Sequence, residues 1–152
     1  MLIPQNVISL CTEQTENVGK ELALAMLADA SLSRFIALYG DLGVGKTAFV
    51  RGFTSPIAPN SRVKSPTFAL VNQYKGEKTS VFHFDMYRIT DEDELYSIGF
   101  YDYLDRNGIC LIEWSENIEY ALPESYLRVE ITKCSQENAD MRQISITAEQ
   151  RS

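Results

Sequence analysis

Residues 40–47 read G-D-L-G-V-G-K-T, a spacing of glycine, lysine and threonine that suits the binding of phosphate groups. Glycines let the backbone turn so that successive N–H groups point at phosphate oxygens. The ammonium group of Lys46 can reach the outer phosphates, and the hydroxyl of Thr47 can hold Mg²⁺. The pattern predicts a nucleotide site formed by Gly40, Asp41, Leu42, Gly43, Val44, Gly45, Lys46 and Thr47.

The segments on either side of this loop support the same interpretation. Residues 35–39 (F-I-A-L-Y) are a continuous apolar run of the length of a buried strand. Residues 46–53 can open a helix that places Phe49 and Phe53 on one face. A helix N-terminus beneath the loop adds N–H donors and partial positive charge for phosphate. The alternative, a glycine-rich turn without a ligand, would need neither flank.

The composition fits one globular α/β domain over residues 1–152, of which 45% are hydrophobic and 23% charged. No apolar run is long enough to cross a membrane, and residues 1–4 lack the start of an export signal. Three scattered cysteines without a C-x-x-C pair fit a reducing compartment. We therefore expect a cytoplasmic protein.

Charge and histidine content exclude several classes of chemistry. A net charge of −7 argues against direct gripping of nucleic acid, which depends on Lys and Arg. We expect any contact with RNA to run through a partner. His83 is the only histidine, so a zinc site or catalytic triad that needs others is excluded.

Hydrophobic periodicity predicts a central mixed sheet flanked by helices. A helix starts near Thr12, for which Thr12 and Thr15 are candidate N-caps, and a long turn-rich loop covers residues 54–64. The expected strands are residues 7–10, 35–39, 67–74, 80–87, 109–112, 127–131 and 144–148. The third and fourth strands form one hairpin, and the last two form a second hairpin that extends the sheet.

The first hairpin permits an inference about the position of the site. If its second strand runs parallel to strand 35–39, Asp85 arrives at the same sheet edge as the phosphate loop. The first strand of the hairpin then starts at that edge, which places residues 65–67 beside the nucleotide. Ligands of open α/β sheets bind at the carboxyl ends of the strands.

Two acids at strand ends compete for the roles that accompany a phosphate loop. One carboxylate is needed near the Mg²⁺, and another group must orient the attacking water. Asp85 and Glu113 both follow apolar strands, so their position alone does not assign the two roles, and a surface salt bridge is the alternative for either. Trp114 is either a core aromatic or a lid near the nucleotide.

The motifs together resemble the bacterial TsaE (YjeE) family of small ATPases. The resemblance rests on the phosphate loop, on S-P-T-F at residues 65–68, on H-F-D-M-Y-R at residues 83–88, and on Glu113-Trp114, in this order and spacing. It implies a P-loop ATPase needed for threonylcarbamoyladenosine, a tRNA modification beside the anticodon in tRNAs that read codons beginning with A.

By this resemblance the chain binds ATP and Mg²⁺ and drives a transferase heterodimer of TsaB and TsaD type, which itself contacts the tRNA. The family pattern implies that Thr47 and Glu113 hold Mg²⁺, that Thr67 lies in a switch segment responding to the γ-phosphate, and that Asp85 is required for hydrolysis. Adenine contacts from Thr12, Thr15 or Arg142 stay open because the ends of the chain match more loosely.

Two other functions remain as alternatives. A small-molecule kinase would need cationic groups for a second phosphate, and the chain has 14 Lys and Arg without an Arg-rich lid segment. A GTP-dependent switch usually carries an Asn/Thr-Lys-x-Asp element, which is absent here. Residues 105–108 match D-x-x-G but precede a strand, so we expect a turn there. Arg88 is a candidate for a transition-state arginine within the chain.

Overall fold

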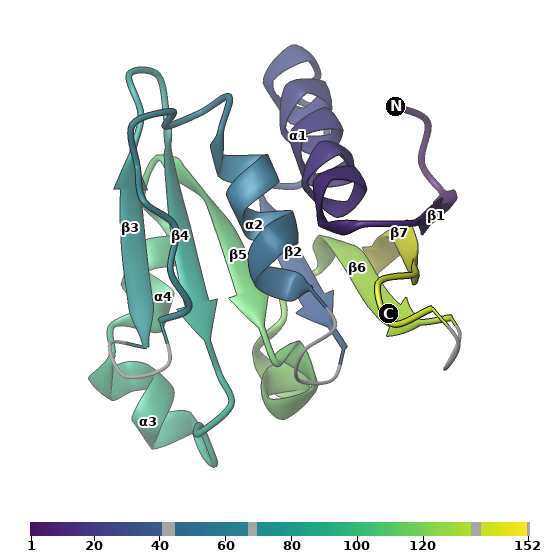
Figure 1. Cartoon of the computed structure of the whole chain (residues 1–152). Coiled ribbons are helices and arrows are strands. Elements are labelled where there is room, and N and C mark those ends of the chain that lie inside the picture. Colours follow the sequence, from purple (N-terminus) through teal and green to yellow (C-terminus); the bar gives the residue numbers. More distant parts are fainter. Residues whose placement is uncertain (41–44, 67–69, 135–137, 152) are drawn as a thin grey trace.

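The computed structural model describes residues 1–40, 45–66, 70–134 and 138–151, which form one layered α/β arrangement (Figure 1). The strands are β1 (Gln5–Ser9), β2 (Phe35–Tyr39), β3 (Val71–Lys75), β4 (Ser80–Asp85), β5 (Gly108–Glu113), β6 (Ser125–Lys133) and β7 (Arg142–Gln150). The helices are α1 (Thr12–Ala28), α2 (Lys46–Thr54), α3 (Glu92–Ser97), α4 (Phe100–Leu104) and the 3₁₀ helix η1 (Ser115–Ala121).

The strands make one seven-stranded mixed sheet in the order β1-β7-β6-β2-β5-β4-β3. Strands β6, β2, β5 and β4 run parallel, whereas β3, β7 and β1 pair antiparallel with their neighbours. The predicted fold class, the two hairpins and the extension of the sheet by the second hairpin are therefore confirmed. Because β4 runs parallel to β2 through β5, the carboxyl ends of all three lie at the edge where the phosphate loop begins.

Helices cover the two faces of the parallel strands. Helices α1 and α2 lie side by side over one face (Figure 1), where Leu22, Phe49, Phe53 and Leu111 are fully buried. The other face is buried among Phe84, Phe100, Ile118 and further apolar residues of α3, α4 and η1. No helix in the described part of the chain is both long and apolar enough for a membrane crossing.

Glycine permits the close contact between α1 and α2. A Cβ atom on Gly52 would lie 1.8 Å from the carbonyl oxygen of Glu16, and one on Gly19 would lie 2.2 Å from that of Phe49. No real Cβ approaches a backbone atom so closely, so larger residues at these positions would force the helices apart. The position of α2, and with it the end of the loop, depends on this contact.

Three local predictions are wrong. The N-cap of α1 is Cys11, which has an extended backbone and whose side chain makes no capping hydrogen bond; Thr12 is already helical. Thr15 is buried, and its hydroxyl lies 2.7 Å from that of Ser9. β4 ends at Asp85 and not at residue 87, because the Asp85 side chain accepts a hydrogen bond from the Tyr87 N–H and turns the chain.

The expected start of the first hairpin also shifts. β3 begins at Val71, since Leu70 has the left-handed φ of 68° and leaves the strand conformation. The expected strand residues 67–69 lie outside the described residues. The D-x-x-G match at residues 105–108 is a turn that leads into β5, as expected.

Candidate nucleotide site

The predicted phosphate loop connects β2 to α2 at the carboxyl edge of the sheet. Gly40 and Gly45 have φ values of 143° and 101°, which L side chains rarely adopt, so glycine is needed at both ends of the loop. Asp41, Leu42, Gly43 and Val44 lie outside the described residues. α2 begins at Lys46, and its first N–H groups face the edge at which the predicted phosphates would bind.

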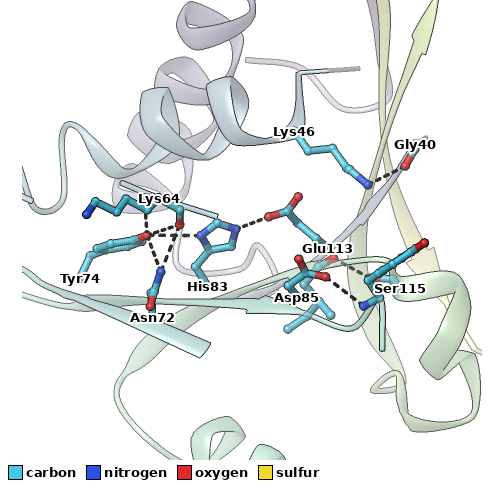
Figure 2. A network of polar contacts seen from close by, with 11 residues as sticks. Gly40, Lys46, Lys64, Asn72, Tyr74, His83, Asp85, Glu113 and Ser115 are labelled. Carbon is cyan, nitrogen blue, oxygen red and sulfur yellow. Dashed lines mark hydrogen bonds and ion pairs between the residues drawn. The ribbon is translucent and has the colours of Figure 1, made fainter. Parts of the chain in front are cut away.

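Lys46 is buried at this edge with only 5% of its surface exposed. Its Nζ donates to the carbonyl oxygen of Gly40 at 2.6 Å and lies 4.0 Å from the centre of the Trp114 ring (Figure 2 shows the first contact). An ammonium group over an aromatic ring is a favourable cation–π contact. The lysine is therefore held at the mouth of the loop.

Trp114 lies directly after β5 in a left-handed conformation, with φ 60° and ψ 43°. Its ring is half-buried, packs against the second core and stands 4.9 Å from the ring of Tyr87. The structure thus places Trp114 partly in the core and partly beneath Lys46, and the role as a lid near the nucleotide stays a prediction. Sparsely populated backbone conformations of this kind gather at functional sites.

Asp85 and Glu113 are register neighbours at the ends of β4 and β5. Both side chains lie on the α2 face of the sheet, and their exposed fractions are only 6% and 4%. Burial raises the pKa of Asp85, and the nearby Glu113 charge acts in the same direction. The hydrogen bond from the Tyr87 N–H and the charge of Lys46 oppose this rise in pKa. The alternative of a surface salt bridge is wrong for both acids, because neither lies on the surface.

Glu113 has a buried partner that the sequence analysis missed. Nε2 of His83 lies 2.5 Å from Oε2 of Glu113, and the imidazole is fully buried (Figure 2). An ionised carboxylate has only acceptors, so the Nε2–H donates. The period of a strand was the available signal, since His83 and Asp85 are two residues apart and must share a face.

Four further residues that the sequence analysis named have separate positions. Thr47 is half-buried in the first turn of α2, and Thr67 lies outside the described residues. Thr15 lies beside the loop, because its methyl group would be 3.8 Å from a Cβ atom on Gly45. Arg142 starts β7 and donates to the carbonyls of Ala139 and Met141.

The oxygen ligands gathered here fit Mg²⁺. Magnesium is usually held through one or two carboxylates together with waters and phosphate oxygens. Asp85 and Glu113 supply two neighbouring carboxylates, and Thr47 supplies a hydroxyl at the same edge. Among the described residues no group of three or more His, Cys, Asp or Glu could cage a metal by itself. Such a site matches an ion that binds together with a nucleotide.

Cavity size does not by itself locate this site. A cavity of about 480 Å³ lies at the opposite end of the sheet, between Pro56–Asn60 and the turn at residues 75–79. A groove of about 390 Å³ begins at Gly40 and continues over Arg128 and Glu130. The chemistry of the side chains locates it instead, since the described residues that line the larger of these two cavities include no pair of buried charges.

The fold and the site define the class of protein: an α/β fold in which a glycine-rich segment joins a buried parallel strand to a helix, with two buried acids on adjacent strands, has the architecture of the P-loop proteins. The family model described as "Threonylcarbamoyl adenosine biosynthesis protein TsaE" matches residues 10–144. The chain therefore belongs to the TsaE family.

Curated relatives and a solved structure agree with this assignment. The chain is 41% identical over 114 residues to the tRNA threonylcarbamoyladenosine biosynthesis protein TsaE of Haemophilus influenzae, covering 74% of this chain and 72% of that protein. It is 36% identical over 136 residues to the Bacillus subtilis protein of the same name, covering 90% and 80%. The crystal structure of Bacillus subtilis YdiB superposes with a TM-score of 0.72 at 28% identity, covering 99% of this chain and 88% of that chain.

Proposed function

We propose that this chain is an ATPase of tRNA threonylcarbamoyladenosine biosynthesis, acting in the cytoplasm through a transferase heterodimer of TsaB and TsaD type. The observation that carries the proposal is the convergence of Lys46, Asp85 and Glu113 at the carboxyl edge of β2, β4 and β5. Its biological context comes from the family and from the names of the relatives. The acidic charge of the chain supports indirect contact with tRNA.

The first role of the chain is to bind the triphosphate. The N–H groups at the start of α2 and the glycine-rich backbone receive the phosphate oxygens. Lys46 exchanges its contacts with Gly40 and Trp114 for the outer phosphates. That exchange costs little desolvation because the ammonium group is already buried.

The two acids differ in their surroundings, which supports different roles. The hydrogen bond from His83 fixes the orientation of the Glu113 carboxylate, as is typical of a carboxylate that binds a metal. We assign Mg²⁺ binding to Glu113 and Thr47; bound there, the ion would neutralise charge that develops on the phosphates. Asp85 has no such partner among the described side chains, and its raised pKa suits a group that orients water and accepts a proton.

Hydrolysis by purified chain tests the proposal. We expect slow turnover of ATP and strong stimulation by the heterodimer, because a missing transition-state arginine costs roughly 10³- to 10⁵-fold in related sites. Arg88→Ala distinguishes a residue of this chain from one of the partner: the rate of the isolated chain falls only if Arg88 acts in cis. Rapid turnover of ATP by the chain alone, unchanged by the heterodimer, would contradict the scheme. Equal use of GTP would favour the alternative of a GTP-dependent switch.

A further inference from the structure

A buried chain of polar contacts leads from Glu113 away from the phosphate loop. It crosses from β5 to His83 on β4 and then to Tyr74 on β3 (Figure 2). The Tyr74 hydroxyl lies 3.4 Å from Nδ1 of His83 and donates to the carbonyl of Lys64 at 3.0 Å. The same hydroxyl accepts from the Lys64 N–H at 3.2 Å. Three strands are thus linked to one backbone position outside the sheet.

Burial makes the members of this chain of contacts depend on one another. The exposed fractions of His83 and Tyr74 are 0% and 6%, so no bulk water replaces a lost partner. Leaving a buried polar group without its partner is destabilising, which penalises movement of any one member alone. If the Glu113 side chain shifts, His83 and Tyr74 therefore have to shift with it to keep their hydrogen bonds.

The hydroxyl of Tyr74 has one proton and two acceptors within reach. With Nε2–H of His83 donating to Glu113, Nδ1 of the neutral imidazole is an acceptor. The Lys64 carbonyl is the nearer acceptor, and it also receives Nδ2 of Asn72 at 3.1 Å. If the hydroxyl proton turned to His83, Asn72 would still satisfy that carbonyl. When the proton points to the Lys64 carbonyl, Nδ1 of His83 has no donor among the described residues; when it points to Nδ1, both acceptors have one. The two arrangements therefore differ in how firmly Lys64 is held.

Lys64 lies where such a difference has a consequence. It precedes Ser65 and Pro66, and the Pro66 carbonyl accepts from the N–H of Leu70 at 2.8 Å. The carbonyl of Leu70 accepts in turn from the backbone N–H of Asp85 at 3.0 Å. The described residues on the two sides of segment 67–69 are therefore attached to each other and, through Leu70, to the strand that carries Asp85.

We propose that His83 and Tyr74 are positioning residues that couple the placement of Glu113 to the backbone at Lys64, and so to the segment that enters the site edge. The coupling rests on the proposed function only in taking Glu113 as a site acid. A change at Glu113 on nucleotide and metal binding alters the hold of Tyr74 on Lys64. The segment at residues 62–66 thereby reports the state of the site at the surface.

Amide hydrogen exchange of Lys64, measured by NMR on the whole chain without nucleotide or metal, tests the coupling. Glu113→Ala removes the partner of His83 and should speed exchange roughly three- to tenfold, the effect of one weakened hydrogen bond. Asp85→Ala is the matched control, because it deletes the neighbouring carboxylate on the same face without touching His83. It should leave the Lys64 rate within about twofold. The amide of Val129, a fully buried residue of β6 that is paired with strands on both sides, monitors general loosening.

Unchanged exchange in folded Glu113→Ala, or equal acceleration in Asp85→Ala, overturns the coupling. Tyr74→Phe removes only the hydroxyl, keeps the fold, and should speed Lys64 exchange directly. In turnover assays His83→Gln should raise the Mg²⁺ concentration for half-maximal rate roughly 10- to 100-fold, the usual effect of losing a ligand's buried partner. Tyr74→Phe should shift this concentration in the same direction by less, with kcat at saturating Mg²⁺ largely kept. No shift in either variant contradicts the positioning role.

The coupling and the proposed function fail separately. If Lys46→Ala binds ATP as well as the parent chain while Lys64 still responds to Glu113, the ATPase proposal is wrong and the coupling stands. If Lys46 is needed for ATP and Lys64 ignores Glu113, the coupling is wrong and the ATPase proposal stands.

Discussion

The central parallel strands β2, β4 and β5, called the parallel half below, and the hairpin of β6 and β7, called the antiparallel half, treat their polar residues in opposite ways. Every residue of β2 and β5 is buried, and in β4 only Ser80 is partly exposed. In β6 and β7 buried positions instead alternate with partly or fully exposed ones. Helices cover both faces of the parallel half, whereas polar residues such as Arg128 and Glu130 line a groove on the antiparallel half.

This difference explains where the buried charges occur. A polar residue in β6 or β7 can turn to the open face, as Arg128 does by pairing with Glu130 at 2.7 Å. A polar residue at the end of β4 or β5 has no open face, so Asp85 and Glu113 are desolvated. Desolvation perturbs titration and strengthens electrostatic contacts, which is the property a phosphate-processing site needs.

Removal of core packing in the parallel half should have the largest effect on stability. Leu111→Ala deletes a fully buried side chain between the sheet and α2, and we expect a loss of about 2–5 kcal/mol in the free energy of unfolding. Urea denaturation measures it. Thr132→Ala, on an exposed position of β6, is the control and should change stability by roughly 0.5 kcal/mol or less. Similar losses in both would show that the two halves are equally covered.

Removal of the buried ammonium should have the next largest effect, on nucleotide affinity. Lys46→Ala should weaken ATP binding by roughly 10- to 150-fold, since hydrogen bonds to charged groups contribute about 1.5–3 kcal/mol. Isothermal titration calorimetry measures the change. Lys133→Ala removes an exposed lysine at the same edge of the antiparallel half and should leave affinity nearly unchanged. Equal binding by parent chain and Lys46→Ala, with the fold intact, would remove the basis of the phosphate-loop assignment.

Much of this arrangement could be predicted from sequence because it depends on local patterns. Continuous apolar runs identified β2 and β5, and alternation identified the second hairpin. The ends of elements were less predictable, since they depend on individual contacts. The bond from the Tyr87 N–H to Asp85 ends β4, and the left-handed Leu70 delays β3.

The site was predictable in its members but not in their pairing. Strand ends placed Asp85 and Glu113 together, yet the partner of Glu113 depended on which strands are adjacent. Glu113, His83 and Tyr74 lie next to one another on one face only because β5, β4 and β3 are adjacent in the sheet in that order. The strand period places His83 on the face of Asp85, but it does not say that the imidazole reaches Glu113.

Separate substitutions of the two acids should divide metal dependence from turnover. Glu113→Ala should raise the Mg²⁺ requirement roughly 10- to 100-fold, because the carboxylate that His83 orients is lost. Asp85→Ala should keep nucleotide affinity and lower kcat by roughly 10²- to 10⁴-fold, the range for loss of a general base. Thr47→Ala should resemble Glu113→Ala. Steady-state rates over a Mg²⁺ titration test the assignment, and the reverse pattern would exchange the two roles.

The smallest effect concerns stability and its dependence on pH. Because burial raises the pKa of Asp85, the folded state holds that proton more tightly than the unfolded state does. Below the ordinary pKa of an aspartate, about 3.9, both states are protonated and the group contributes nothing. As pH rises the unfolded state ionises first, so stability is lost until the pH passes the raised pKa, and the cost then persists at neutral pH.

Asp85→Asn removes this cost and keeps an oxygen for the Tyr87 N–H. Without nucleotide or metal it should therefore stabilise the chain at pH 7 by about 0.5–2 kcal/mol, as is common where function opposes stability, while hydrolysis is lost. The gain should fade near pH 4, whereas Asp140→Asn, at an exposed position in the antiparallel half, should show neither gain nor fading. Thermal denaturation of the parent chain and the two variants across pH measures the difference. If Asp85→Asn is less stable than the parent chain at neutral pH, the folded protein accommodates the ionised carboxylate well. The contrast between the two halves of the sheet then does not extend to this charge.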